Sequence, residues 1–349
     1  MSDSKRKRIA LVGLGTHGMH AVLPALGHAK EWELVAVADK DPEQLQKLPY
    51  IRGYTTVEIL LQKEELDAIY IATLPDSHCA VALSGLHHGV HIICEKPMGA
   101  DARETEMMLD AAQKAGREII VMFENRFASY YRKVRQWIRE GAVGRVEAIH
   151  IQSFRKHPVK QPRRTHLLNA AGCLDCGIHM LDLARYWNEG AHWETIHALG
   201  TWFDEPVERP PHVGILARLD NGVMVTFEDS FSYGYRINNV PWNFGKESLA
   251  IVGTHGVITD AMTENGREFQ LISEDRSESI PAVLSEHEHE IPKVLGAFAV
   301  WLRGELDEET SASLARGKDG HEAQRIVDEV NNQAVATRIL SDVSPSLKR

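Results

Sequence analysis

The sequence predicts an α/β domain with a doubly wound parallel sheet, followed by an α+β domain whose sheet is mainly antiparallel. Up to about residue 125, apolar strand-like runs alternate with segments of helical periodicity, the pattern of parallel strands joined by helices. Beyond that point strand-like runs follow one another, and two of them meet at Asp-Asn-Gly at residues 220–222, a strong hairpin signal. A chain of 349 residues also exceeds the usual single-domain length. We therefore expect one domain at 1–125 and another at 126–349, with the C-terminal helix near their junction.

The composition is that of an ordinary globular protein, with 43% hydrophobic and 25% charged residues. A formal net charge of −10 argues against nucleic-acid binding, because contacts to phosphates need clustered Lys and Arg. The basic run at residues 5–8 leads into an apolar stretch that is too short for a membrane span or a secretory signal. Four cysteines are too few for a disulfide scaffold. We therefore expect a cytoplasmic protein without membrane or nucleic-acid partners.

A glycine-rich turn follows the first predicted strand. Residues 8–18 read RIALVGLGTHG, with G-x-G-x-x-G spacing, and a helical pattern and a second strand at 33–39 follow. In this arrangement one glycine permits the tight turn, one lets the backbone approach a pyrophosphate, and one allows close packing of helix and strand. The pyrophosphate lies at a helix N-terminus, where backbone N–H groups and the dipole favour an anion. The residues expected in this dinucleotide-binding loop are Gly13, Gly15, Thr16, His17 and Gly18.

Asp39 ends the second predicted strand, about 20 residues after the glycine turn. An acid at this position accepts the hydroxyls of the adenosine ribose. Its carboxylate would repel the extra 2′-phosphate of NADP, so the sequence favours NAD. Lys40 follows directly and could compensate for that charge, so NADP stays possible.

Further strands and helices continue the alternation: a strand at 66–75, a helix around 80–89, a strand at 90–98, a helix to about 115 and a strand at 118–123. Ligands of doubly wound sheets bind outside the carboxyl ends of the strands. The candidate cofactor contacts at these ends are Thr73, Pro75, His78, Glu95 and Lys96. Lys96 has a second possible role, because an ammonium group can bond a substrate hydroxyl and favour its alkoxide character as hydride leaves.

Residues 172–182 read GCLDCGIHMLD, which could indicate a metal site, a redox pair or a catalytic pair. A helical projection puts Cys176 on an apolar stripe and both Asp175 and His179 on a polar one. The apolar stripe continues with Met180, Leu183 and Trp187, and the polar stripe with Asp182 and Tyr186. Buried cysteine commonly acts as a small hydrophobic residue, and no second Cys-x-x-Cys supplies the further ligands of a zinc site. We predict structural cysteines and no metal, with zinc binding and redox pairing as the alternatives.

Asp175 and His179 are a candidate acid/base pair, because residues four apart meet on a helix surface. A neutral imidazole beside a carboxylate can remove a proton from a hydroxyl near neutral pH, while the carboxylate orients the ring. The alternative is a core histidine with satisfied hydrogen bonds.

The motifs GLGTHG, ATLPDSH, CEKPM, FENRF and LDCGIHMLD together resemble the Gfo/Idh/MocA family of NAD(P)-dependent oxidoreductases, over almost the whole chain. The resemblance implies an N-terminal Rossmann domain and a C-terminal domain with a large open sheet for substrate binding and oligomerisation. It implies sugar, sugar-acid or cyclitol substrates and a homodimer or homotetramer. It also implies that Lys96 is the catalytic-site lysine and that Asp175 and His179 are the family's Asp-x-x-x-His pair.

A basic segment precedes the predicted catalytic helix and contains no acid between Phe154 and Leu174. We hypothesise that it holds a carboxylate or phosphate of the substrate; an exposed, solvated loop is the alternative. With two residues of FENRF, the candidate substrate contacts are Asn125, Arg126, Arg155, Arg163, Arg164 and His166. A dehydrogenase is the preferred function. The competing functions are a cofactor-retaining hydrolase, lyase or epimerase of the same fold, and a noncatalytic nucleotide sensor.

Overall fold

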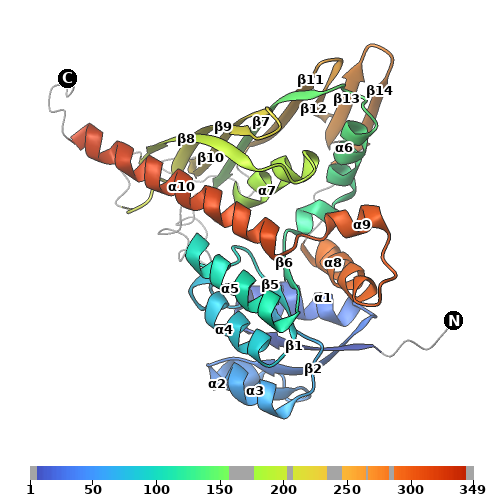
Figure 1. The fold of residues 1–349 in the computed structure, drawn as a ribbon, viewed down its shortest axis with the longest axis vertical. Helices are drawn as coiled ribbons and strands as arrows, with labels where there is room; N and C mark the ends of the chain where they lie inside the picture. The colour runs from blue at the N-terminus through green and yellow to red at the C-terminus, as the bar shows by residue number, and fades with distance from the viewer. Residues whose placement is uncertain are drawn as a thin grey trace. The chain divides into compact units, whose positions relative to one another are not determined.

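The computed structural model describes residues 6–156, 177–202, 207–233, 246–264, 266–282 and 287–342. The chain forms two compact units. The first contains Met1–Ala128 and Leu284–Gln324, and the second contains Ser129–Val283 and Arg325–Arg349. Figure 1 shows why a single cut in the sequence does not separate the two units: α8 (His287–Trp301), coloured orange, belongs to the first unit, whose first strands are blue.

The first unit contains a six-stranded parallel sheet in the order β3-β2-β1-β4-β5-β6. Its strands are β1 (Lys7–Val12), β2 (Trp32–Ala38), β3 (Arg52–Tyr54), β4 (Ala68–Ile71), β5 (His91–Cys94) and β6 (Ile119–Val121). The helices that connect them are η1 (Gly18–Val22), α1 (Leu23–His28), α2 (Pro42–Gln46), α3 (Val57–Lys63), α4 (Pro75–His87) and α5 (Ala102–Ala115). The predicted doubly wound parallel sheet is confirmed.

The central strands are buried on both faces, as the continuous apolar runs of the sequence require. All four residues of β4 are buried, and so are Ile9 and Leu11 of β1. The helix expected at 80–89 begins earlier, at Pro75, because proline at the first helical position has a preset φ and needs no hydrogen bond for its nitrogen. The strand expected at 66–75 therefore ends at Ile71.

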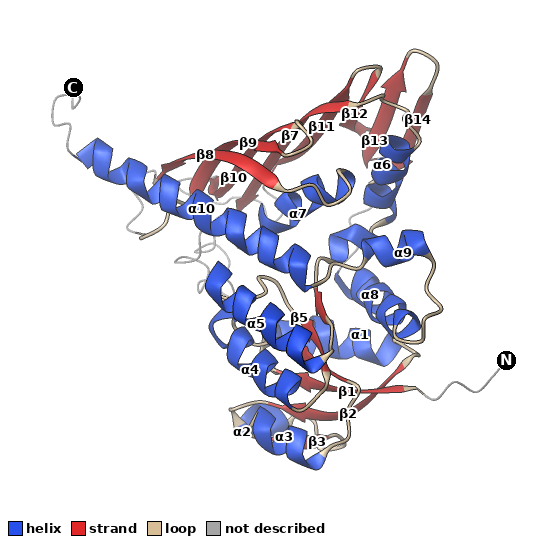
Figure 2. Cartoon of the chain, in the orientation of Figure 1, coloured by secondary structure: helices blue, strands red, loops and turns tan. Residues whose placement is uncertain are grey.

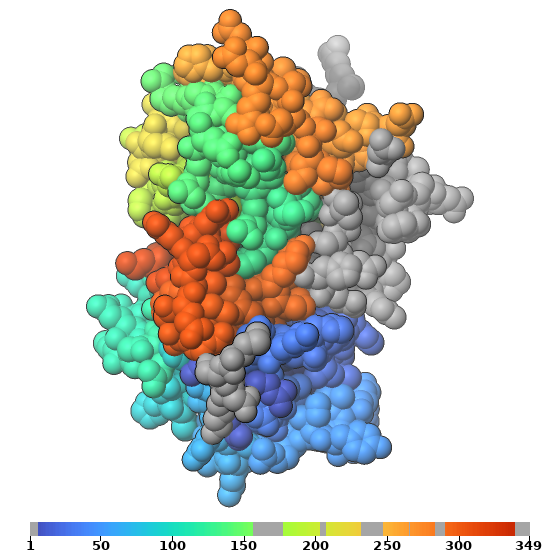
Figure 3. All heavy atoms as spheres, turned by 90° about the vertical axis from the view of Figure 1, so that its right-hand side faces the viewer, coloured from blue at the N-terminus to red at the C-terminus, as the bar shows by residue number. Residues whose placement is uncertain are grey.

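Two helices from late in the sequence complete the first unit, α8 and α9 (Glu308–Ser313). Ile291, Val294 and Phe298 of α8 lie in the same core as Ile9 and Trp32. The indole N–H of Trp32 also donates to the carbonyl of Leu295 at 2.8 Å. Figure 3 shows atoms of α8 and α9, orange to red, next to blue atoms of the N-terminal elements. The apolar face of α8 therefore belongs to the core of the first unit.

The second unit contains an eight-stranded sheet in the order β14-β13-β12-β11-β7-β10-β9-β8. Its strands are β7 (Val146–Lys156), β8 (Trp193–Thr201), β9 (His212–Leu219), β10 (Met224–Tyr233), β11 (Lys246–Gly253), β12 (Gly256–Thr263), β13 (Gly266–Ser273) and β14 (Ser277–Pro281). All neighbouring pairs are antiparallel except β7 and β10. The predicted mainly antiparallel sheet is confirmed, and so is the hairpin at residues 220–222, which joins β9 to β10.

Two helices cover one face of this sheet, α6 (Ser129–Arg139) and α7 (Ile178–Trp187), as Figure 2 shows. The rings of Tyr130 and Phe269 stack with centroids 5.6 Å apart, and the start of α7 packs on Phe227. We call this the inner face of the sheet and the opposite one the outer face. The predicted C-terminal helix is α10 (Gly317–Asp342). In its second half, Gln333 bonds the backbone of Ala198 and Ile196 and so protects the edge strand β8.

No helix in the described parts of the chain is long and apolar enough to cross a membrane.

Candidate active site

The glycine turn after β1 requires glycine at two of its three positions for steric reasons. Gly13 has φ +100°, and a Cβ there would lie 2.7 Å from the carbonyl of Ala72, beyond the end of β4. A Cβ on Gly18 would lie 2.1 Å from the carbonyl oxygen of Gly13. Side chains at these positions would therefore push apart β1, β4 and the first helical segment.

Gly15 differs, because a Cβ there would have no heavy atom within 4 Å. The fold has room for a side chain at this position, whereas a phosphate that lies close to the backbone leaves no such room. Gly15 and the next two residues are exposed. The turn therefore leaves open the space that the pyrophosphate of a dinucleotide occupies next to this backbone, and the residues present fit that group.

Asp39 lies just beyond β2 with both carboxylate oxygens engaged. One accepts the N–H of Leu14 at 2.6 Å, and the other accepts the N–H of Asp41 at 2.9 Å. These bonds hold the carboxylate beside the glycine turn. Each oxygen keeps a lone pair for a ribose hydroxyl, and the neighbouring Lys40 is exposed.

Glu95 follows β5 directly and is 8% exposed. Its backbone N–H donates to the carbonyl of Ile71, which continues the pairing of β5 with β4. One oxygen, Oε1, lies 2.7 Å from Nε2 of His17 in the glycine turn, and it also accepts the hydroxyl of the buried Tyr70 at 2.7 Å. Three segments distant in sequence therefore meet at one carboxylate.

The charges in this cluster shift the pKa of each group. The negative charge of Glu95 raises the pKa of the His17 imidazole, with a further contribution from Glu124 and opposed by Lys96. Burial alone would raise the pKa of Glu95, but the attraction and hydrogen bond of His17 outweigh burial and leave it lowered. Burial and the neighbouring carboxylate raise the pKa of Tyr70 well above its ordinary value. Glu95 is therefore ionised and Tyr70 neutral at neutral pH.

His78 is fully buried, and both of its ring nitrogens face backbone carbonyls. Nδ1 lies 2.8 Å from the oxygen of Pro97, and Nε2 lies 3.1 Å from that of Thr73. We predicted His78 as a cofactor contact; because its ring has no exposed surface, we interpret it as a support that joins the two loops on which Thr73 and Lys96 lie. Pro75 begins α4 beside it, and the half-buried Lys96 directly follows Glu95.

α7 presents His179 from a helix whose ten residues are all buried. His179 is 6% exposed and shares its stripe with the buried Asp182 and Tyr186, as the projection predicts. The predicted apolar stripe faces α6: the hydroxyl of Tyr131 lies 4.0 Å from the sulfur of Met180, and the indole N–H of Trp187 donates to the carbonyl of Tyr131. Asp175, Cys173 and Cys176 lie outside the described residues.

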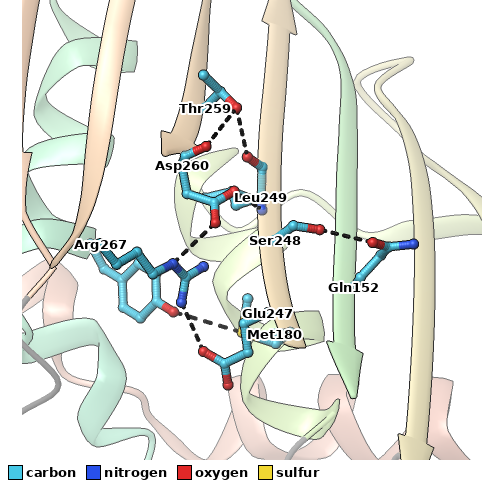
Figure 4. Close-up of polar contacts among 9 residues, drawn as sticks. Gln152, Met180, Glu247, Ser248, Leu249, Thr259, Asp260 and Arg267 are labelled. Atoms are coloured by element: carbon cyan, nitrogen blue, oxygen red, sulfur yellow. Dashed lines mark hydrogen bonds and ion pairs between the residues drawn. The ribbon is translucent and has the colours of Figure 1, made fainter. Parts of the chain in front are cut away.

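Arg155 lies near the end of β7, where its guanidinium pairs with Glu247 of β11. The other oxygen of Glu247 pairs with Arg267 at 2.9 Å, and Arg267 also contacts Asp260 at 3.1 Å. Figure 4 shows Arg267 between these two acids, close to α7. The absence of acids in the segment itself is thus offset by Glu247 from a neighbouring strand. Arg163, Arg164 and His166 lie outside the described residues.

Arg126 and Asn125 lie on η2 (Glu124–Phe127). Arg126 is 3% exposed and pairs with Asp319 at the start of α10, at 3.3 Å. We predicted a substrate contact for Arg126; because the buried guanidinium already has a carboxylate partner, we interpret it as structural. Asn125 is half-buried, and its carbonyl accepts the N–H of Ala128.

Within the described ranges, no three His, Cys, Asp or Glu side chains are grouped as metal ligands. Cys79 and Cys94 are buried free thiols that contact backbone carbonyls. The prediction of structural cysteines concerns Cys173 and Cys176, which lie outside the described residues.

Sequence reasoning missed two buried polar residues, Tyr70 in the first unit and Asp229 in the second. Tyr70 is the single polar side chain in the buried strand AIYI, which is the signal that could have found it. Asp229 is another: it is fully buried on β10, next to Gly177 at the start of α7. Its inward position follows from the alternation that buries Val225 and Phe227, so a period of two could have located this carboxylate.

Two family models match successive parts of the chain. One, described as an oxidoreductase family with an NAD-binding Rossmann fold, matches residues 7–123. The other, the GFO/IDH/MocA C-terminal domain, matches residues 131–259. The chain belongs to the Gfo/Idh/MocA family. The predicted family and its NAD-binding Rossmann domain are thereby confirmed.

Relatives of this Gfo/Idh/MocA protein include named dehydrogenases. A 1-carboxy-3-chloro-3,4-dihydroxycyclohexa-1,5-diene dehydrogenase from Comamonas testosteroni is 30% identical over 226 residues, which cover 62% of this chain and 56% of that relative. A myo-inositol 2-dehydrogenase from Thermotoga maritima is 24% identical over 244 residues, 65% of this chain and 70% of the relative. The match thus spans little more than half the length of the first of these enzymes.

The Gfo/Idh/MocA fold also extends over nearly the whole chain. The crystal structure of an oxidoreductase from Agrobacterium radiobacter, in complex with NAD+, L-tartaric acid and magnesium, has a TM-score of 0.78 and 19% sequence identity. The alignment covers 96% of this chain and 98% of that chain. This likeness shows that both units have the family's fold.

Proposed function

We propose that this protein is an NAD(P)-dependent dehydrogenase or reductase that acts on a CH–OH group of a sugar, sugar acid or cyclitol. The observation that carries the proposal is the glycine turn, where Gly15 leaves space for a pyrophosphate beside the anchored carboxylate of Asp39. NAD is the favoured cofactor and NADP is possible. The relatives named for inositol and dihydrodiol substrates support cyclic polyols as the substrate class.

The proposed cofactor contacts come from the glycine turn and the strand ends. Asp39 accepts ribose hydroxyls, and the backbone from Gly15 to Gly18 faces the pyrophosphate. Thr16, His17, Thr73, Pro75 and Glu95 belong to the same set of loops. When bound, the nicotinamide supplies the acceptor or donor of the hydride.

Three side chains have the proposed catalytic roles. His179 removes the hydroxyl proton, Asp175 orients the ring or binds a neighbouring hydroxyl, and Lys96 stabilises developing alkoxide charge. His179 lies on a buried helix, which limits its motion. The first unit is the proposed dinucleotide-binding domain, and the second the proposed substrate-binding and oligomerisation domain.

We further propose a homodimer or homotetramer that associates through the outer face of the large sheet. Leu199, Leu216 and Met224 are exposed there, next to a hollow of about 980 Å³ that strands β7 to β12 line. A cytoplasmic location stays a prediction from the composition, and so does the absence of a nucleic-acid partner.

The test is a screen of sugars, cyclitols and sugar acids for NADH or NADPH formation, repeated with His179→Asn. We expect the variant to bind NADH like the wild type and to lose most of its turnover. Near-normal turnover in His179→Asn would contradict the assigned base. Product formation without net NADH would favour the cofactor-retaining alternative, and NADH binding without turnover of any substrate would favour the sensor.

A further inference from the structure

The His17–Glu95 contact lies where one proton can change the charge around the cofactor. The charged neighbours of His17 come from two segments: Glu95 and Lys96 follow β5, and Glu124 lies on η2. With His17 protonated, two cations face two carboxylates. Without that proton, a net negative charge remains in the cluster, which we call the His17 cluster (His17, Glu95, Lys96 and Glu124).

The strand order places the His17 cluster on the nicotinamide side of the crevice. Asp39 follows β2 and Glu95 follows β5, on opposite sides of the junction between β1 and β4. A dinucleotide lies across that junction, with its adenosine ribose at the acid after β2. Its nicotinamide half therefore extends toward β4 and β5, where the His17 cluster lies.

Two hydrogen bonds fix the Glu95 carboxylate of the His17 cluster. Oε1 of Glu95 is fixed from two directions, by His17 and by the hydroxyl of Tyr70, each at 2.7 Å. The Glu95 side chain is only 10% exposed, whereas that of His17 is 42% exposed, so the imidazole can exchange its proton with solvent. A fixed carboxylate with little water around it interacts more strongly with a nearby positive charge than a fully solvated carboxylate does.

Oxidised nicotinamide carries a positive charge on its ring, and reduced nicotinamide is neutral. We propose that His17 and Glu95 form a proton-controlled charge site beside the nicotinamide, in which loss of the His17 proton favours the oxidised cofactor over the reduced one. The inference rests on the proposed binding of a dinucleotide. Binding of the oxidised cofactor then lowers the proton occupancy of the imidazole, and the displaced proton goes to solvent, whereas binding of the reduced cofactor leaves that occupancy unchanged.

The test is titration calorimetry of the wild-type protein with NAD+ and with NADH, at pH values from 6 to 9 and in two buffers with different ionisation enthalpies. We expect the NAD+ dissociation constant to fall about tenfold as pH rises through the pKa of His17, with release of at most about half a proton. NADH affinity should change little over the same range. If NADPH binds more tightly than NADH, the NADP pair serves equally, because its nicotinamide charges are the same.

Variants separate His17 from other titrating groups. His17→Gln should abolish the difference in pH dependence between NAD+ and NADH affinity. Glu95→Gln should move the pH at which NAD+ affinity changes to a lower value, because the imidazole loses its counter-ion. His20→Gln changes an exposed histidine on η1 and should leave the difference unchanged. NMR titration of the cofactor-free protein should show the His17 pKa falling in Glu95→Gln.

The outcomes also distinguish this inference from the proposed function. Equal proton release with NAD+ and NADH, or an unchanged difference in His17→Gln, would overturn the inference while dinucleotide binding stands. No binding of any of the four nicotinamide cofactors would overturn both. Equal proton release by the wild-type protein with the two cofactors would overturn the inference even if a variant does not fold.

Discussion

The three glycines of one motif have different physical functions at the level of single residues. Gly13 and Gly18 are needed by the fold, because a Cβ at either position would overlap backbone atoms. A Cβ on Gly15 would meet open space, so the lack of a side chain there affects only the binding of a ligand. The sequence motif predicted all three together, and only the structure separates the packing positions from the binding position.

Substitutions by alanine should show this division. Gly15→Ala should fold with an unchanged melting temperature but bind NADH at least tenfold more weakly, because the methyl group occupies the space of the pyrophosphate. Gly18→Ala should destabilise the protein by about 2 kcal/mol or more, since its Cβ would lie 2.1 Å from a carbonyl oxygen. Thermal unfolding and NADH fluorescence titration measure the two effects. Equal stability losses in both variants would contradict the assignment.

His91 should make stability depend on pH. Burial, and then the charges of Arg117 and Lys7, lower its pKa to about 4, and its Nδ1 accepts the backbone N–H of Glu118 at 3.0 Å. The unfolded chain binds a proton at this residue below about pH 6.5, whereas the folded protein binds it only below about pH 4. The stabilisation is therefore fully present above pH 6.5 and is lost as pH falls toward 4.

We expect this loss to amount to about 1.4 kcal/mol per pH unit within that window, on the order of 3 kcal/mol in total. Urea unfolding at pH 4.5, 5.5 and 7 should show it as a difference between the wild type and His91→Asn, which removes the titrating ring. His88→Asn, at an exposed neighbouring histidine, is the control. Identical pH profiles for wild type and His91→Asn would disprove the role of His91.

At the level of elements, charged side chains join four strands of the second sheet. Glu247 on β11 pairs with Arg155 of β7 and Arg267 of β13, and Arg267 also pairs with Asp260 of β12. Oδ1 of Asp260 accepts the N–H of Leu249 at 2.6 Å, where the carboxylate replaces a backbone partner between β11 and β12. Figure 4 shows the two bonds of Arg267, to Asp260 and to Glu247. The arginine therefore holds the register of the strands beneath α7.

Arg267→Met should destabilise the protein by about 3 kcal/mol, because the poorly exposed Asp260 loses its pair with Arg267 and Glu247 keeps only its pair with Arg155. Arg145→Met removes a pair with Glu147 that is largely exposed and should leave the free energy of unfolding nearly unchanged. Urea denaturation of the two variants gives the comparison. Similar small losses of stability in both variants would show that the ion pairs of Arg267 contribute no more than the exposed pair of Arg145.

Local patterns predicted most elements, and the failures have a common cause. The period of α7 predicted a buried helix with His179 on a polar stripe, because a helix fixes which residues share a face. Contacts between distant segments were not predictable in this way. The bond from His17 to Glu95 spans 78 positions, and the pair of Arg126 and Asp319 spans 193. Sequence spacing carries no information on such partners.

At the level of the whole molecule, the main difference from the sequence prediction is the return of residues 284–324 to the first unit. The apolar face of α8 was visible in the sequence, but its partner was not, since any uncovered sheet or helix could accept it. Trp32 and Leu295 meet across 263 positions. A division of the chain at one point therefore cannot reproduce the two units.

The outer face of the large sheet provides the last prediction. Leu216 of β9 and Met224 of β10 are 48% and 40% exposed there, next to a hollow lined by His150, Gln152 and Glu228. In a twofold homodimer built on this face each residue occurs twice, so one substitution places two like charges in the interface. We expect Leu216→Glu with Met224→Glu to lower the mass in solution from the wild-type oligomer to a smaller species, measured by light scattering. Met107→Glu, at a 43% exposed position on α5 of the first unit, should leave the mass unchanged. A wild-type monomer would contradict the proposed oligomer, and an oligomer that survives both charges would place association elsewhere. A smaller species with unchanged melting temperature would show that the outer face holds the subunits together.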